Sequence, residues 1–242
     1  MGKKAGIIII GDEILSGKVQ DYNSFFMAQE LWSHGITLCR ISIIGDSIDD
    51  IAEEVRIFSG EFDYIFTSGG IGPTHDDVTI AGIAKAFGVQ PVIDDTLKAR
   101  LETKQGSLSP EQLKMAEVPE GAELLDDETL SFPLIKFRNI YILPGIPQLL
   151  RKKFIAIEKL FDEPLIYLKK VYVDETESKM APLLNEIVRK YEKVKIGSYP
   201  VLDNKEYTVM VTLESLDKES LVEAYKNLLG LLSPGRLVGV EE

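Results

Sequence analysis

Residues 5–17 read AGIIIIGDEILSG, and this stretch decides the fold. A continuous apolar run such as 5–10 is typical of a strand that is covered on both faces in a parallel sheet. The run ends at Gly11, and two carboxylates, Asp12 and Glu13, follow at once. In an open parallel sheet, ligands bind just beyond the carboxyl ends of the strands. The stretch therefore predicts a buried first strand that carries two acidic side chains to the edge where ligands bind.

Strand-like and helix-like patterns alternate through the first third of the chain. Apart from 5–10, strands are predicted over 38–44 and 64–67, and helices over 23–34, 48–58 and 78–87. Asn23 is a candidate N-cap, and Cys39, inside the second strand, is interpreted as a small buried hydrophobe. Such alternation specifies right-handed βαβ units. We expect an α/β domain of three layers, α/β/α, with a mostly parallel sheet.

The later segments complete this domain and add a smaller one. The sequence predicts two strands over 133–137 and 139–143, a helix over 148–160 and a linker over 161–164. After the linker, it predicts five elements in the order strand (166–173), helix (183–191), strand (194–199), strand (207–214) and helix (221–229). The last five elements predict a small α+β module with a ferredoxin-like order. We place the domains at residues 1–163 and 164–242.

Composition excludes several classes of partner. The 242 residues contain 27 Lys and Arg against 39 Asp and Glu, a net charge of −12. Such acidity argues against binding to nucleic-acid backbones and to anionic membranes. A single cysteine rules out an internal disulfide, and no apolar run approaches the roughly 20 residues of a membrane span. We expect a cytoplasmic protein.

Residues 68–79, SGGIGPTHDDVT, form the strongest local motif. Its glycines allow backbone N–H groups to approach a ligand closely, and the helix that follows favours a phosphate. Candidate ligand contacts in this loop are Ser68, Gly69, Gly70, Gly72, Thr74 and His75. Asp76 and Asp77 would repel a bare phosphate, but they suit one that is bridged by a divalent cation. The alternative is an ordinary turn in which one aspartate caps a helix.

Other candidates each have a second interpretation. Asp12 and Glu13 face a metal or a ribose, or else belong to a solvated turn. Asp46 is a ligand or the cap of the following helix. His75 contacts phosphate or makes a structural bond, since no Cys/His cluster accompanies it. Pro144 and Gly145 present backbone groups to a ligand, or simply break the chain before a helix.

Several of these segments carry a family resemblance. GDEILSG (11–17), GIGPTHDD (70–77) and LPGIP (143–147) resemble the molybdopterin-binding superfamily, which includes MoaB, MogA and the gephyrin domains. They look more closely like the branch formed by the N-terminal domains of CinA and of eukaryotic FAD synthase. KMA (114–116), VPEGA (118–122) and IGSYP (196–200) match that branch as well. The resemblance covers nearly the whole chain.

The resemblance implies a three-layer α/β/α fold that binds pterin or nucleotide phosphates at the strand ends. Asp77 and Asp46 correspond to two aspartates that the molybdenum-cofactor branch requires for activity. The CinA-like branch implies metal-dependent pyrophosphatase activity on substrates of the ADP-ribose or FAD type. The chain departs from the family at Ile71, where Thr is common, and at residues 130–133, LSFP, where CinA proteins often have Gly-x-Ala-Pro-Gly.

Two functions follow as hypotheses. In the first, Asp77 and Asp46, with Asp76, act in catalysis and hold a magnesium, manganese or cobalt ion at a nucleotide diphosphate. In the second, the protein binds molybdopterin in molybdenum cofactor biosynthesis, by binding alone or by adenylyl transfer, without hydrolase activity. Either way, the partner is a small-molecule nucleotide or pterin phosphate. The resemblance also implies a homo-oligomer, a dimer or a trimer.

Overall fold

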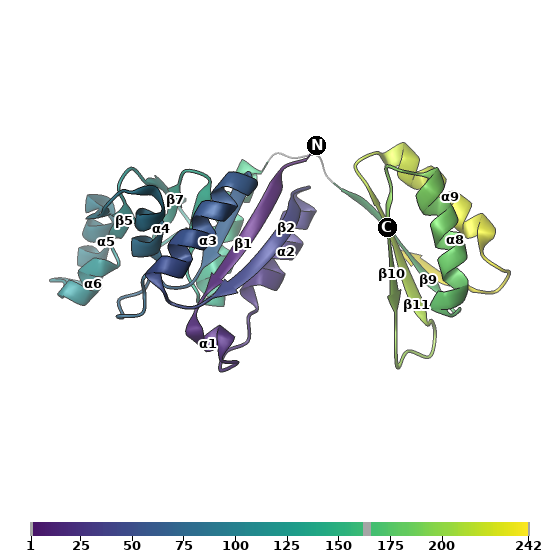
Figure 1. The fold of residues 1–242 in the computed structure, drawn as a ribbon, viewed down its shortest axis with the longest axis horizontal. Coiled ribbons are helices and arrows are strands. Elements are labelled where there is room, and N and C mark those ends of the chain that lie inside the picture. Colours follow the sequence, from purple (N-terminus) through teal and green to yellow (C-terminus); the bar gives the residue numbers. More distant parts are fainter. Residues whose placement is uncertain (1, 162–165, 242) are drawn as a thin grey trace. The chain divides into compact units, whose positions relative to one another are not determined.

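The computed structural model describes residues 2–161 and 166–241, which divide into two compact units, 1–163 and 164–242 (Figure 1). Most of the predicted linker, 162–164, lies outside the described residues. Within the described part of the chain, no helix is both long and apolar enough to cross a membrane.

The first unit is built on a six-stranded sheet in the order β2-β1-β3-β8-β7-β6. Its strands are β1 (Lys4–Ile10), β2 (Thr37–Ile44), β3 (Tyr64–Ser68), β6 (Glu123–Leu125), β7 (Leu134–Phe137) and β8 (Ile140–Leu143). The four strands β2, β1, β3 and β8 run parallel, whereas β7 is antiparallel to both β8 and β6. The predicted mostly parallel sheet is confirmed, and β6 is a short strand that the sequence analysis missed.

Helices cover both faces of this sheet, so the predicted three layers are confirmed as well. They are α2 (Asn23–Ser33), α3 (Ile48–Glu61), α4 (Thr79–Phe87) and α7 (Pro147–Ile157). Alternate residues of β1 point to opposite faces. Ile8 and Ile10 pack with α3 and α4, whereas Ile7 and Ile9 pack with α2 and α7. The smaller elements are α1 (Asp12–Leu15), β4 (Pro91–Ile93), α5 (Asp95–Gln105), α6 (Pro110–Lys114), β5 (Glu117–Pro119) and a 3₁₀ turn, η1 (Glu158–Leu160).

All four covering helices begin at the same edge of the sheet, since each follows a parallel strand. Their unpaired N–H groups give this edge a partial positive charge. Neither of two candidate caps, Asn23 and Asp46, caps its helix. The hydroxyl of Ser47, and not the carboxylate of Asp46, accepts from the N–H of Asp50 at the start of α3. Asn23 is the first residue inside α2, and Asp21 accepts from its N–H over 2.9 Å.

Cys39 also departs from its prediction, because its side chain is exposed. It lies on β2, the outermost strand of the sheet. The register between β1 and β2 shifts at this point, so that Leu38 pairs with Ala5 and Arg40 with Gly6. Cys39 is therefore the extra residue of a bulge and is left without a partner across the strand.

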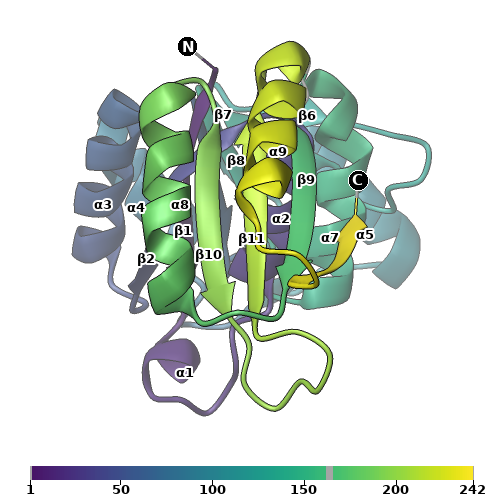
Figure 2. The same cartoon turned by 90° about the vertical axis from the view of Figure 1, so that its right-hand side faces the viewer.

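The second unit is a four-stranded antiparallel sheet with two helices on one face (Figure 2). Its elements are β9 (Tyr167–Val173), α8 (Glu177–Lys190), β10 (Lys195–Pro200), β11 (Val209–Ser215), α9 (Lys218–Leu231) and β12 (Leu237–Glu241). Val171, Val211 and Leu213 pack under Leu184 and Leu228. The strand order β10-β11-β9-β12 is the ferredoxin-like order that the sequence predicts. β12, at the edge of this sheet, has no counterpart among the predicted elements.

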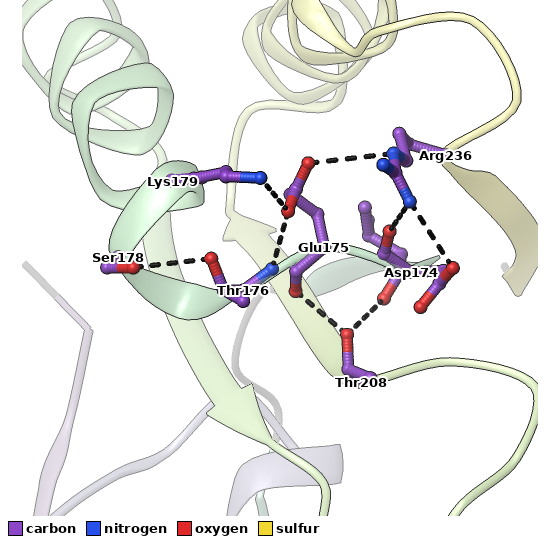
Figure 3. Close-up of polar contacts among 8 residues, drawn as sticks. Asp174, Glu175, Thr176, Ser178, Lys179, Thr208 and Arg236 are labelled. Carbon is purple, nitrogen blue, oxygen red and sulfur yellow. Dashed lines mark hydrogen bonds and ion pairs between the residues drawn. The ribbon is translucent and has the colours of Figure 1, made fainter.

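A polar cluster closes one end of this second sheet (Figure 3). The carboxylate of Glu175 accepts from the N–H of Thr176 over 3.0 Å and forms ion pairs with Lys179 and Arg236 at 3.1 and 3.6 Å. These contacts hold the pKa of Glu175 below its usual range, with the Thr176 N–H as the largest cause. The hydroxyl of Thr208 donates to the carbonyl of Glu175 over 2.8 Å. We interpret the cluster as a structural clamp between loops, since its charges are paired with each other.

Candidate functional site

Two carboxylates from neighbouring strands meet at the carboxyl edge of the first sheet. The N–H of Asp12, after β1, donates to Oδ2 of Asp46, after β2, over 2.9 Å. The N–H of Asp46 donates back to Oδ1 of Asp12 over 3.4 Å. A Cβ on Gly45 would lie 2.4 Å from that same Oδ1, so a larger residue there would displace the Asp12 carboxylate. The sequence thus fixes an aspartate pair 34 residues apart.

Negative charge accumulates around this pair. The pKa of Asp46 is raised, first by partial burial and then by repulsion from Asp12, Glu13 and Asp76, while the N–H of Asp12 opposes the rise. Glu13 and Asp76 are exposed to solvent. Three carboxylates therefore repel the carboxylate of Asp46, and a cation there would relieve this repulsion. The predicted residues Asp12, Glu13, Asp46 and Asp76 lie in one region of the edge.

Next to the carboxylates, the backbone of Gly69 and Gly145 packs closely without side chains and forms what we call the floor of the site. Gly69 has a φ of 110°, and a Cβ there would lie 2.1 Å from the carbonyl oxygen of Ile10. Its N–H donates to the carbonyl of Leu143 over 3.2 Å. A Cβ on Gly145 would lie 3.4 Å from Cα of Gly69, so the two predicted glycines are neighbours. Gly69 itself is buried, whereas Gly145 is exposed, so the backbone is accessible to a ligand at Gly145.

The start of α4 is fastened to the same floor. The hydroxyl of Thr79 donates to the carbonyl of Gly69 over 2.8 Å, and the N–H of Thr79 donates to the carbonyl of Gly70 over 3.0 Å. Gly70 has a φ of 64°, and a Cβ there would lie 2.3 Å from Oγ1 of Thr79. Neither Asp76 nor Asp77 caps this helix, which has no side-chain cap.

Asn23 belongs to the edge too, which sequence reasoning missed. Its Nδ2 donates to Oγ of Ser68 over 3.0 Å and to the carbonyl of Gly145 over 2.7 Å. Ser68 in turn donates to the carbonyl of Pro144 over 3.3 Å. Because a carbonyl can only accept, the nitrogen of the amide faces Gly145. The other amide atom, Oδ1, is buried without a hydrogen-bond partner. The only sequence signal is a polar residue at a helix start, which is ordinarily a cap.

Asp77 lies in the outer arm of the glycine-rich loop. Its Oδ2 accepts from the N–H of Thr74 over 2.8 Å and from the Thr74 hydroxyl. Gly72 lies underneath, since a Cβ there would come within 2.6 Å of the same oxygen. Lys114 from α6 donates to the carbonyl of Thr74 over 2.6 Å. The carboxylate of Asp77 thus stabilises the conformation of the loop to which it belongs.

His75 points into solvent. Its side chain is 98% exposed, and Nδ1 lies 3.9 Å from Asp76. The predicted structural bond is therefore not made, and a ligand contact stays a prediction.

The carboxylates alone do not form a metal cage. Among residues 2–161 and 166–241, no three His, Cys, Asp or Glu side chains are grouped so as to hold a metal ion. Magnesium, however, is commonly held by one or two carboxylates together with substrate phosphates and water. The edge thus offers carboxylate oxygens on one side and bare backbone with helix N-termini on the other. That arrangement suits a phosphate ligand and a cation together.

Two family models divide the chain in the same way as the structure does. Residues 6–166 match the model described as a probable molybdopterin binding domain, and residues 165–241 match the middle domain of FAD synthase. Together they span nearly the whole chain.

Individual relatives agree with these models. The chain is 33% identical to a probable FAD synthase of Caenorhabditis elegans, over 96% of this chain and 50% of that protein. It is 34% identical to a CinA-like protein of Thermotoga neapolitana, over 81% of this chain and 50% of that one. The chain thus spans about half the length of these curated relatives. A crystal structure from Thermoplasma acidophilum, described as the protein CinA with unknown function, is 32% identical, with a TM-score of 0.62, over 66% of this chain and 98% of that one.

Proposed function

The chain belongs to the family of the probable molybdopterin binding domain, and we propose that it acts within that family as a metal-dependent pyrophosphatase on dinucleotides of the ADP-ribose or FAD type. One observation carries this proposal: the aspartate pair Asp12–Asp46 lies beside a floor of bare backbone at the edge where four helices begin. Relatives named FAD synthase and CinA-like add support, since FAD is itself a dinucleotide with a diphosphate bridge.

The backbone at this edge binds the diphosphate. Gly145 is exposed and Gly70 half-buried at this edge, and α2 and α4 direct their N-termini toward it. Oriented N–H groups favour an anion without requiring a lysine or an arginine. Asn23 holds the two loops that frame this floor at a fixed separation, through Ser68 and Gly145.

The carboxylates fit a divalent cation. Burial and three neighbouring carboxylates raise the pKa of Asp46, and carboxylate oxygens are the donors that hard cations prefer. Asp46 and Asp12 would hold the ion together with phosphate oxygens of the substrate. A bound divalent ion neutralises charge on the diphosphate and lowers the pKa of a water that attacks it. Asp77 orders the loop over the phosphate through Thr74.

Release of AMP tests this proposal. The protein is incubated with ADP-ribose, FAD or NAD and with magnesium, manganese or cobalt, beside Asp46→Asn, Asp77→Asn and, as a matched control, Asp50→Asn on the exposed start of α3. We expect metal-dependent AMP release that falls by about a hundredfold or more in Asp46→Asn and stays unchanged in Asp50→Asn. An equal rate in Asp46→Asn, or no AMP release from any substrate with any metal, would falsify the proposal.

A second candidate is a molybdopterin-binding protein without hydrolase activity. The matching family model, described as a probable molybdopterin binding domain, favours it. Titration calorimetry with molybdopterin separates the two functions. Tight binding with no turnover of any nucleotide would establish the second function, whereas turnover would establish the first.

A further inference from the structure

Lys114 is the last residue of the short helix α6 (Figure 1), and its side chain reaches the glycine-rich loop of the candidate site. The helix is fixed at its start, where Ser109 and Gln112 form a capping box. The chain is fixed again directly after Lys114, because Met115 packs against the hydrophobic core and Ala116 is fully buried. The side chain of Lys114 thus extends from a well-anchored backbone.

The outer arm of the glycine-rich loop, residues 73–77, is bonded mainly to itself. The carboxylate of Asp77 accepts from the N–H and the hydroxyl of Thr74, and the N–H of Asp77 donates to the carbonyl of Thr74 over 3.3 Å. Residues 73–76 are exposed to solvent. Among the hydrogen bonds of the described residues, only the one from Nζ of Lys114 to the carbonyl of Thr74, over 2.6 Å, joins this arm to another element. The position of the outer arm therefore depends on Lys114.

The outer arm carries Asp76, whose charge reaches the aspartate pair. Partial burial raises the pKa of Asp46 most, and repulsion from three carboxylates, of which Asp76 is one, adds to it. The pKa of Asp76 itself is lowered, first by the nearby hydroxyl of Thr74 and, among the smaller causes, by the charge of Lys114. Asp76 thus interacts both with Asp46 and with the lysine that holds its loop.

We propose that Lys114 is a positioning residue, whose bond to Thr74 keeps the carboxylate of Asp76 close enough to attract a divalent cation to the site. This inference rests on the proposed function, because the cation is the one that the proposed reaction requires. The attraction between a carboxylate and a cation falls as their separation grows, so it depends on where the arm is held. Folding orders the arm in advance, and binding of the ion does not have to order it. Lys114 acts on the ion through Asp76 and does not touch it.

The positive charge of Lys114 has the opposite effect on a cation. An ammonium group repels a divalent ion, so removal of its charge alone would strengthen the binding of manganese. Loss of the bond to Thr74 would weaken that binding, because the outer arm could then carry Asp76 away from the site. The sign of the change in manganese affinity therefore separates positioning from a simple effect of charge.

Manganese alone is the probe, and the paramagnetic resonance signal of the free ion measures its binding to the protein without nucleotide. We expect Lys114→Met to bind manganese about tenfold more weakly than the wild type. Lys114→Arg keeps a donor for a single carbonyl, so its affinity should stay within about threefold of the wild type. Lys104→Met is the matched control, because Lys104 on α5 also donates to a carbonyl, that of Ser131 in a different loop, over 3.2 Å. Its affinity for manganese should be unchanged. Circular dichroism verifies that each variant is folded.

A double variant tests the route through Asp76. If Lys114 acts by placing Asp76, Lys114→Met should weaken manganese binding by less than about twofold once Asp76→Asn is present. The proposal is overturned if the loss is the same with and without Asp76→Asn, if Lys114→Met binds manganese as tightly as the wild type or more tightly, or if the wild type binds no manganese. Failure of the pyrophosphatase proposal is a separate result, because it is a lack of AMP release, whereas manganese binding is measured without nucleotide.

Discussion

Asp12 and Asp46 each accept a hydrogen bond from the backbone N–H of the other, over 2.9 Å from Asp12 to Asp46 and 3.4 Å in return. This reciprocal contact sets the direction of both carboxylates without help from a lysine or an arginine. It joins the ends of two adjacent parallel strands, and the small size of Gly45 permits it. The negative charge at this edge is thus built in before any ligand arrives, and this relationship underlies the proposed use of a cation.

The floor of the site depends on Gly69. In Gly69→Ala, the new Cβ would lie 2.1 Å from the backbone oxygen of Ile10 at a φ of 110°. We expect a loss of about 3 kcal/mol or more in the free energy of unfolding, since backbone cannot move aside cheaply. Gly121→Ala is the matched control, because its φ is 86° but nothing lies within 4 Å, and it should cost about 1 kcal/mol.

Urea unfolding followed by fluorescence measures both variants. The single tryptophan, Trp32, lies on α2, so the signal reports on the first unit. If both variants lost the same free energy of unfolding, the close approach of Gly69 to Ile10 would not be what restricts position 69 to glycine.

Asn23 should tolerate alanine better than aspartate. Asn23→Ala removes the donor to Gly145 and Ser68 and is expected to cost about 1–2 kcal/mol. Asn23→Asp replaces that donor with a carboxylate oxygen facing the carbonyl of Gly145, so it should cost more, although it is closer in shape. Gln29→Ala and Gln29→Glu, at an exposed position of the same helix, serve as controls. An aspartate variant as stable as the alanine variant would contradict the assigned orientation of the amide.

Lys153 makes stability depend on pH. It is buried on α7, where its ammonium donates to the carbonyl of Pro133. Burial lowers its pKa to about 8. The folded protein therefore binds fewer protons than the unfolded chain between about pH 8 and the ordinary lysine pKa of about 10.4, and the stability contributed by this group rises with pH across that window.

A comparison with Lys153→Met isolates this effect. The free energy of unfolding of the wild type, minus that of the variant, should rise by about 2 kcal/mol from about pH 7.5 to about pH 10. The unpaired carbonyl of Pro133 costs the same at both values and cancels. Lys152→Met, at an exposed neighbouring position, should show no such trend. A flat difference for Lys153→Met would show that the ammonium is solvated.

Much of the fold follows from the sequence because the signals are periodic. The apolar run of β1 and the apolar stripe of α3 each determine one element and the face that it buries. Gly88 ends α4 in the left-handed conformation that glycine adopts without strain. β6 has only three residues and no room for a period, which is why it was missed. Cys39 was misjudged because exposure depends on which strand lies at the edge, and no local pattern encodes strand order.

The candidate site was predictable in its loops and not in its contacts. Carboxyl ends of parallel strands must meet, so residues 11–13, 45–46 and 68–72 belong together by topology. Whether Asp46 caps α3 or accepts from Asp12 is decided by contacts between residues far apart in the chain. Asn23 looks like a cap in the sequence, and only its contact with Gly145, 122 residues away, reveals its position in the site.

Nucleotide binding with and without a divalent ion tests the central claim most directly. ADP-ribose is titrated into the protein by calorimetry, first with a chelator and then with manganese, for the wild type and for Asp46→Asn. If the carboxylates and the diphosphate hold the ion together, manganese should strengthen ADP-ribose binding to the wild type by about tenfold or more, or about 1.4 kcal/mol, and should have little effect on Asp46→Asn. Equal affinity of the wild type with and without manganese, or an equal gain in both proteins, would contradict the account.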